Sequence, residues 1–163
     1  MDRATKFLLA VLGAAVLIPP SPGKAQLLEV RQTVFGMDCA PCAYAVERRM
    51  TRLDGAAEVQ LSLNDGFARV RFDQAHGTTL EEIRRAIRDS GFGAREARVH
   101  VRGTVVRDGD VLILRTPAGE RYRLRGDDPL ALPDPGTEGE LRGRIPPDRD
   151  DAGRWFLDLG REG

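Results

Sequence analysis

The sequence lacks an apolar run long enough to cross a membrane. Its longest run, Phe7 to Ile18, has 12 residues, whereas a membrane-spanning helix needs about 20. The chain also lacks an excess of charge, because 25 basic residues balance 25 acidic ones, and this balance gives no indication of a nucleic-acid partner. No catalytic acid–base pair or phosphate-binding glycine loop stands out, so we expect the protein not to be an enzyme.

The first 25 residues are typical of a secretory signal peptide and not of a folded segment. Two basic residues, Arg3 and Lys6, precede the apolar run, and a proline-rich stretch breaks it. The small residues Gly23 and Ala25 fit a cleavage site, so the mature chain would begin at Gln26. We therefore expect a periplasmic or secreted protein whose mature chain is not embedded in the membrane, with an uncleaved anchor as the alternative.

Residues 26 to 102 show two successive strand–helix–strand patterns. Alternating apolar side chains predict four strands, and apolar side chains at helical spacing predict two helices. Pro41 suits the first turn of the first helix and Thr79 can cap the second, while Asn64 to Gly66 is a hairpin turn signal between the middle strands. The order β-α-β-β-α-β is that of a ferredoxin-like α+β sandwich.

The second half of the chain shows short strands separated by tight turns. Five strand candidates, with one helical turn between the third and the fourth, predict a small all-β barrel of the oligonucleotide/oligosaccharide-binding (OB) type. We place the boundary near Arg102 and Gly103, although the strand that begins near Ala97 can run continuously from one unit into the next. The predicted organisation is a signal peptide over 1–25, an α+β domain over 26–102 and an OB-like barrel over 103–160.

Cysteine is scarce, and the two cysteines of the chain, Cys39 and Cys42, lie between the first predicted strand and the first predicted helix. At such a junction both sulfurs can point at one ion, and the positive end of the helix dipole lowers the pKa of a thiol. Thiolates prefer soft ions such as Cu(I) and Zn(II). Two sulfurs leave the ion under-coordinated, so an incoming thiolate can add before an old one leaves.

Residues 28 to 102 resemble the heavy-metal-associated domain family, which includes copper chaperones, the N-terminal domains of metal-pumping P-type ATPases and the periplasmic mercury-binding protein. The resemblance rests first on the pattern G-M-x-C-x-x-C at Gly36 to Cys42. Three shorter matches support it: the turn Leu53 to Gly55, the strand Ala68 to Asp73 and the pair Gly91-Phe92. The resemblance therefore covers a full domain length.

The resemblance implies a metal site and a function. Cys39 and Cys42 would be the metal ligands, Met37 would be a buried anchor of the loop, and Phe92 would pack near the loop and shield it. The ion would be a soft heavy metal, with Cu(I) as the first expectation and Zn(II), Cd(II) or Hg(II) as alternatives. The protein would capture this ion and pass it by thiolate exchange to a membrane metal transporter or a metal-acceptor protein.

Asp38 departs from the threonine or histidine that is commoner in the family before the first cysteine. A carboxylate there can join the ligands, and a hard oxygen ligand suits Zn(II) better than Cu(I). The same carboxylate would disfavour the formation of a neighbouring thiolate. The alternative role for Asp38 is to cap the helix by accepting hydrogen bonds from backbone N–H groups.

Two other functions stay open for the motif. The protein can be an exported dithiol–disulfide oxidoreductase, although Asp38 stands where thioredoxins usually have an aromatic residue. The segment from Ala43 to Thr116 contains no proline, so it cannot supply the cis-proline that the thioredoxin fold places opposite its motif. The protein can also be an interaction module in which the metal is regulatory. A structural disulfide is disfavoured, because so short a loop constrains the unfolded chain little.

The remaining candidates favour ordinary roles. We expect Tyr44 at the surface and Phe35 in ordinary packing, the alternative for Phe35 being a docking patch shared with Phe92. The histidines, His76 and His100, are expected to be solvated. Seven arginines that alternate with acidic residues are expected to form a solvated face and not a nucleic-acid site. They are Arg69, Arg71, Arg84, Arg85, Arg88, Arg98 and Arg102.

Overall fold

Eight strands and two helices are present in the part of the chain that the structure, a computed structural model, describes: residues 26–73, 76–127 and 132–160. The protein is therefore of the α+β class, as the sequence predicts. The predicted signal peptide and most of the helical turn expected after residue 127 lie outside the described residues. In chain order the elements are β1 (Leu27–Phe35), α1 (Ala40–Met50), β2 (Ala56–Ser62), β3 (Phe67–Phe72), α2 (Leu80–Arg88), β4 (Gly93–Asp108), β5 (Val111–Arg115), β6 (Arg121–Gly126), β7 (Glu138–Ile145) and β8 (Trp155–Leu159).

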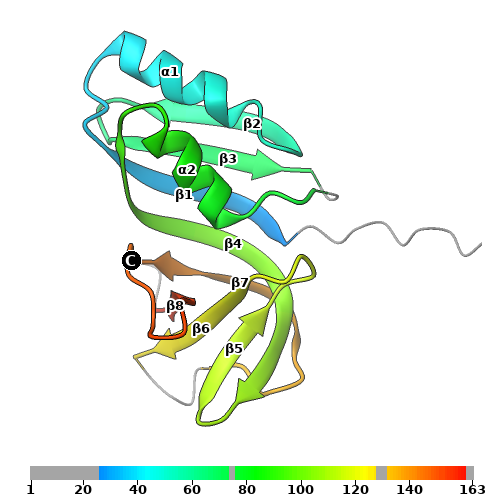
Figure 1. The fold of residues 1–163 in the computed structure, drawn as a ribbon. Coiled ribbons are helices and arrows are strands. Elements are labelled where there is room, and N and C mark those ends of the chain that lie inside the picture. Colours follow the sequence, from blue (N-terminus) through cyan, green and yellow to red (C-terminus); the bar gives the residue numbers. More distant parts are fainter. Residues whose placement is uncertain (1–25, 74–75, 128–131, 161–163) are drawn as a thin grey trace, which may run out of the picture.

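The first six elements follow the predicted order β-α-β-β-α-β. Their strands pair in the spatial order β2-β3-β1-β4, and every pairing is antiparallel. Both helices lie on the same face of these four strands, as Figure 1 shows. The start of α2 is fixed by a capping box, in which Thr79 and Glu82 each accept a hydrogen bond from the backbone N–H of the other.

β4 is a long strand that both halves of the chain share (Figure 1). Its first part pairs with β1 on one side and with β7 on the other, and its last part pairs with β5. The strand passes through Arg102 and Gly103 without interruption, so the predicted continuity is confirmed. The division of the chain into two domains at this point stays a prediction.

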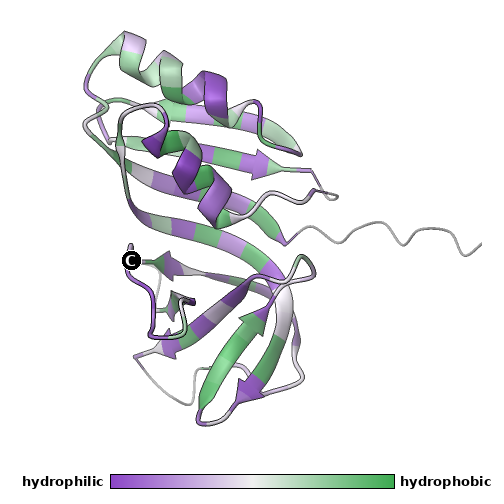
Figure 2. Cartoon of the chain, viewed as in Figure 1, coloured by the Kyte–Doolittle hydropathy of each residue, from purple (hydrophilic) through white to green (hydrophobic). Residues whose placement is uncertain are grey.

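Strands β4 to β8 pair in a closed sequence. β4 pairs with β5, β5 with β6, β6 in parallel with β8, β8 with β7, and β7 again with β4. Figure 2 shows hydrophobic and hydrophilic residues alternating along β4, as expected of a strand with one buried face. All five strand candidates of this half are therefore strands, whereas their description as an OB-like barrel stays a prediction.

Gly143 on β7 is expected to tolerate no side chain. A Cβ atom at this position would lie 2.6 Å from the carbonyl oxygen of Asp158 and 2.8 Å from Cδ1 of Leu157, both on β8. Overpacking of this kind costs about 1–3 kcal/mol, so Gly143→Ala should lower the free energy of unfolding by this amount, measured by urea denaturation. Gly139→Ala on the same strand is the control, because its Cβ would meet no heavy atom within 4 Å. Equal destabilisation by both variants would contradict the prediction.

Arg84 on α2 is buried, with 2% of its surface exposed, so the expectation of a solvated side chain is wrong for this residue. Its Nε donates to Oε1 of Gln32 at 3.2 Å, and its Nη2 donates to the carbonyl oxygens of Ile145 and Pro146 at 3.1 and 3.2 Å. Its guanidinium carbon lies 4.1 Å from the ring centroid of Trp155. Arg84 therefore connects α2 to β1, to the end of β7 and to the start of β8.

Gln32 is the polar residue that interrupts the apolar face of β1, and its contacts explain why it is there. The side chain is fully buried, and its Nε2 donates to the carbonyl oxygens of Arg95 and Glu96 at 2.8 and 2.9 Å. Its Oε1 is left to accept the hydrogen bond from Arg84. The buried amide of Gln32 thus provides a hydrogen-bond acceptor for the guanidinium of Arg84, whereas an apolar residue at this position would leave that N–H group without a partner.

Glu120 makes a second connection between the two halves. Its Oε1 accepts the N–H of Leu80 at the start of α2 at 3.1 Å, and its Oε2 accepts the hydroxyl of Tyr122 on β6 at 2.7 Å. Burial raises the pKa of the Glu120 carboxyl above its ordinary value. The buried apolar residues of both halves form one cluster, so the described part of the chain has a continuous core.

Candidate metal centre

A short loop, Gly36 to Cys39, carries the chain from β1 into α1. Cys39 is the N-cap residue of α1: its backbone is extended, and its Sγ accepts a hydrogen bond from the N–H of Cys42 at 3.2 Å. Pro41 lies in the first turn, where its missing N–H leaves no helical hydrogen bond unmade. Both sulfurs therefore lie at the positive end of the helix dipole, which favours a thiolate in the reduced protein.

The two sulfurs are joined in a disulfide, with a distance of 5.0 Å between the Cα atoms of Cys39 and Cys42. The sequence-based argument against a disulfide is therefore wrong. It concerned how much such a bond stabilises the fold, whereas two neighbouring sulfurs can be oxidised whether or not the bond adds stability. The structure describes the oxidised form, and a site for an ion would require its reduction to thiolates.

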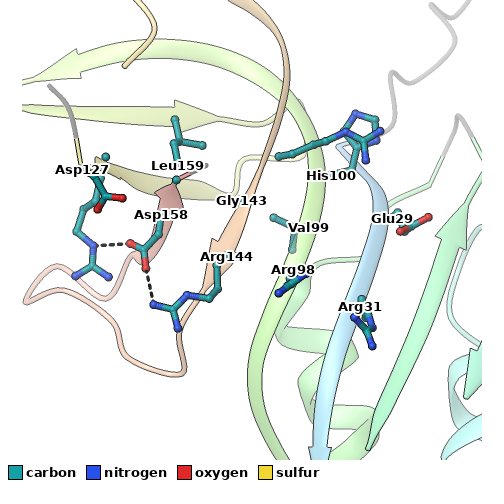
Figure 3. A pocket seen from close by; sticks show the side chains of 14 residues that line it. Glu29, Arg31, Arg98, Val99, His100, Asp127, Gly143, Arg144, Asp158 and Leu159 are labelled. Atoms are coloured by element: carbon teal, nitrogen blue, oxygen red, sulfur yellow. Dashed lines mark hydrogen bonds and ion pairs between the residues drawn. The ribbon is translucent and has the colours of Figure 1, made fainter. Parts of the chain in front are cut away.

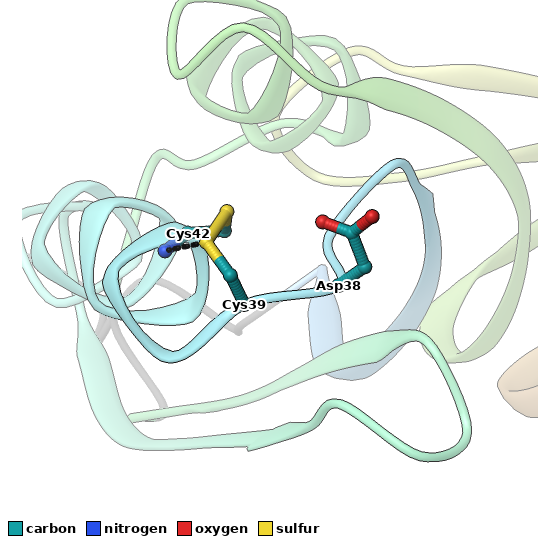
Figure 4. Close-up of side chains that lie close together, drawn as sticks. All are labelled: Asp38, Cys39 and Cys42. Carbon is teal, nitrogen blue, oxygen red and sulfur yellow. Dashed lines mark hydrogen bonds between the residues drawn. A yellow bond between two sulfur atoms is a disulfide. The ribbon is translucent and has the colours of Figure 1, made fainter.

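Asp38 lies beside the two sulfurs (Figure 4). One of its carboxylate oxygens and the sulfurs of Cys39 and Cys42 all lie within 4.8 Å of one another. The alternative role of Asp38 as the helix cap is wrong, because Cys39 occupies the cap position. The exposed carboxylate is therefore available for an ion, and its role as a third ligand stays a prediction.

Met37 lies in the loop and Phe92 borders it. Met37 is 3% exposed and belongs to the hydrophobic core, while Phe92 is half-buried and packs against the same core. A Cβ atom at Gly36 would lie 3.7 Å from Cδ1 of Phe92, so the ring borders the loop. Gly36 itself has a φ of +87°, a left-handed conformation that glycine adopts without strain. These positions are compatible with an anchor and a shield, roles that stay predictions.

Three large apolar side chains are exposed on the segments next to the loop. The exposed fractions are 64% for Phe35, 61% for Tyr44 and 38% for Leu63. The surface position of Tyr44 is confirmed, whereas the expectation of ordinary packing for Phe35 is wrong. Leu63 directly follows the end of β2 at Ser62. Tyr44 and Leu63 line a shallow hollow together.

The two histidines lie in local contacts of their own. His76 is half-buried and not solvated: its Nε2 lies 2.7 Å from the carbonyl oxygen of Leu27, and its ring stacks on that of Phe72. His100 lies 2.7 Å from a carboxylate oxygen of Glu140.

Asp38, Cys39 and Cys42 form the only group of three or more histidine, cysteine or acidic side chains that is close enough to share one ion, across residues 26–73, 76–127 and 132–160. In the same ranges no helix has the length and apolarity needed to span a bilayer.

Comparison with known proteins identifies a heavy-metal-associated domain over residues 32–93. The copper chaperone CopZ of Staphylococcus saprophyticus is 39% identical over 59 residues, which cover 36% of this chain and 85% of that protein. The periplasmic component of the mercuric transport protein of Pseudomonas fluorescens is 29% identical over 87 residues, which cover 53% of this chain and 92% of that protein.

Larger relatives match only in part. Copper-transporting ATPase 2 of Homo sapiens is 34% identical over 80 residues, which cover 47% of this chain but 5% of the ATPase.

The solved structure of oxidized MerP from Ralstonia metallidurans CH34 aligns with a TM-score of 0.38 and 27% identity, over 40% of this chain and 90% of that one. The segment matched to the family, residues 32–93, contains both helices, the loop and both cysteines. The chain belongs to the heavy-metal-associated domain family.

Proposed function

We propose that the protein is an exported carrier that binds a soft heavy-metal ion between the thiolates of Cys39 and Cys42 and passes it to a membrane transporter or an acceptor protein. The observation that carries the proposal is the position of two sulfurs and one carboxylate oxygen within 4.8 Å of one another at the start of α1. Relatives named for copper chaperoning and for mercuric transport support a soft ion. The periplasmic relative supports export.

Capture of the ion requires the reduced form of the site. A dithiol reductant supplies the two electrons and two protons that convert the disulfide between Cys39 and Cys42 into two thiols, and is itself oxidised to a disulfide. The ion then replaces the thiol protons when the sulfurs bind it. The positive end of α1 stabilises the thiolates. Both cysteines are only half-buried, so a donor protein can reach the sulfurs without unfolding the loop.

Release to an acceptor follows from the low number of ligands. Two thiolates leave open positions on the ion, so a thiolate of the acceptor can bind before a thiolate of this protein leaves. Each step then replaces one metal–sulfur bond with another, and the ion is never free in solution. The exposed side chains of Tyr44 and Leu63, which line one shallow hollow, supply an apolar surface on which the acceptor can dock.

Cu(I) is the first candidate for the ion. It is a soft ion, and thiolate sulfur is among its preferred ligands. Hg(II) is also soft, and a relative is named for mercuric transport. Zn(II) and Cd(II) become candidates if the Asp38 carboxylate joins the two sulfurs, because an oxygen ligand suits Zn(II) better than Cu(I).

The test is a metal titration of the same protein in its reduced and oxidised forms. We expect the reduced protein to take up one Cu(I) per chain in competition with a chromogenic Cu(I) chelator, because two thiolates define one site. The protein with its disulfide intact should take up none, and reduced protein with alkylated thiols is the matched control. Equal uptake by the reduced and oxidised forms, or no uptake by the reduced form, would contradict the proposal.

The disulfide itself favours a second candidate, an exported dithiol–disulfide oxidoreductase. In that cycle an external dithiol first reduces the Cys39–Cys42 disulfide. One of the two thiolates then attacks the substrate disulfide to form a mixed disulfide, and the other thiolate displaces the substrate thiol, so that the substrate is reduced and the disulfide of the protein is restored. Turnover on a disulfide substrate, well above that of a free dithiol at the same concentration, would support this function. A carrier is expected to show no such acceleration.

A further inference from the structure

Four arginines lie in a row across the face of the sheet that turns away from the helices. Arg31 on β1 is directly opposite Arg69 on β3 and Arg98 on β4, and Arg98 is in turn opposite Arg144 on β7. Residues paired in this way have Cβ atoms about 4.5–5.5 Å apart, and like charges at this spacing destabilise a sheet. Ion pairs of Arg144 with Glu96 and Asp158 offset part of this repulsion, and an anion beside Arg98 would offset more of it.

The row borders a groove between the two halves of the chain. The groove has a volume of about 730 Å³ and is bordered on one side by β1, β4 and β7 and on the other by the ends of β6 and β8. Figure 3 shows Arg98 between Arg31 and Arg144, with Asp158 next to Arg144. Sites for small molecules typically have volumes of about 300–1,000 Å³, so the groove is large enough for a small ligand.

Positive charge exceeds negative charge in this groove, because five arginines and three carboxylates line it and leave an excess of two. Arg125 and Arg144 already have a partner, since they lie 2.7 and 3.6 Å from the carboxylate oxygens of Asp158. Arg98 and Arg142 form no ion pair with any of the described residues. The lining arginines are Arg31, Arg98, Arg125, Arg142 and Arg144, and the carboxylates are Glu29, Asp127 and Asp158.

We propose that this groove binds a small dianion whose charge is carried by phosphate or carboxylate oxygens. Guanidinium groups bind both kinds of oxyanion with two parallel hydrogen bonds. Arg98 and Arg142 make the first contacts, because neither has to leave an ion pair within the protein, whereas the guanidinium of Arg31 stacks on the ring of Phe67 at 3.8 Å. A double negative charge balances the excess of the groove and offsets the repulsion along the row. The groove shares no residue with the metal site, so the two proposals are independent.

The proposal can be tested by isothermal titration calorimetry at low salt, with inorganic phosphate and succinate as separate probes. The protein is expressed as the full chain and then purified. We expect saturable binding of at least one probe, and the tighter one identifies the chemistry of the ligand. The double variant Arg98→Gln/Arg142→Gln should weaken this binding at least about tenfold, because each charge-assisted hydrogen bond contributes that much. Unchanged circular dichroism spectra establish that the variant is folded.

The matched control removes the same charge from the opposite side of the sheet. Arg48→Gln/Arg49→Gln changes two exposed arginines on α1, and we expect it to leave the affinity for the probe unchanged. Equal weakening in both double variants would overturn the proposal, because net charge alone would then explain the binding. The proposal would also be overturned if neither phosphate nor succinate bound to the protein. Binding of a hexaglutamate peptide without binding of either small anion would overturn it as well, because the groove would then be a docking site for an acidic protein segment.

Discussion

Cys39→Ser is expected to lower the Cu(I) affinity of the reduced protein by at least about 100-fold. Loss of a residue that only hydrogen-bonds to a metal ligand lowers metal affinity by about 10–100-fold, and loss of a ligand itself should cost no less. The variant loses a direct ligand, and a serine hydroxyl does not replace a thiolate for a soft ion. It also loses the Sγ that accepts the N–H of Cys42. Competition with a chromogenic Cu(I) chelator, with reductant present throughout, measures the affinity.

Asp38→Asn is the comparison variant for this experiment. It changes the residue next to Cys39 and leaves both sulfurs in place, so its Cu(I) affinity should stay close to that of the unchanged protein. Its Zn(II) affinity should fall only if the carboxylate is a ligand, because an amide oxygen carries no charge to offer the ion. Retention of Cu(I) binding by Cys39→Ser, combined with its loss in Asp38→Asn, would show that the sulfur pair does not hold the ion.

Arg84→Ala is expected to lower the free energy of unfolding by about 2–5 kcal/mol, because each buried acceptor left without its donor costs about 1–3 kcal/mol and the lost side chain leaves a cavity. The substitution leaves Oε1 of Gln32 and the carbonyl oxygen of Ile145 without the donor that satisfies them, and it opens a space beside Trp155. Burial lowers the pKa of Arg84 only to about 10, so the side chain is charged at neutral pH. Urea denaturation followed by tryptophan fluorescence measures the loss.

Arg85→Ala is the matched control, because Arg85 is the next residue of α2 and its side chain is exposed. Its effect should be within about 0.5 kcal/mol, as for most surface substitutions. Arg84→Met adds a second comparison that fills much of the space but restores no hydrogen bond. If Arg84→Met were as stable as the unchanged protein, the hydrogen bonds of Arg84 would not be what stabilises the contact between the two halves.

The regular part of the fold could be predicted because its signals are local. Alternating apolar residues identify a strand wherever one face is buried, as along β3, where Ala68, Val70 and Phe72 are buried and Arg71 is exposed. The capping box at Thr79 and Glu82 fixes the start of α2 from residues only three positions apart. Such patterns depend on neighbours in the sequence, so one sequence is sufficient to find them.

Arg84 could not be predicted because its environment is assembled from distant segments. On α2 it stands among charged residues and has the composition of a solvated face. Its partners lie on β1, on β4, and at the end of β7 and just after it, and none of them is closer than 11 residues in the sequence. Gln32 was the available signal, since a glutamine on a buried strand face requires a polar partner. Nothing in the sequence identifies that partner as Arg84.

For the candidate metal site, too, one part could be predicted from the sequence and another could not. The motif places Cys39 and Cys42 at the start of a helix by local rules, and the structure has them there. Whether the sulfurs are free or joined depends on the redox state of the surroundings, which no spacing of residues encodes. The exposure of Phe35 depends on which strands cover the end of β1, and this is a property of the folded sheet.

The shared strand has a consequence for how the length of this chain can vary between related genes. From Ala97 to Val101, β4 is hydrogen-bonded to β1 on one edge and to β7 on the other, so one alternation of inward and outward side chains serves both halves. A single inserted or deleted codon in this stretch would invert that alternation on one side of the change. Insertions can accumulate in the turns, whereas the shared segment must keep its length.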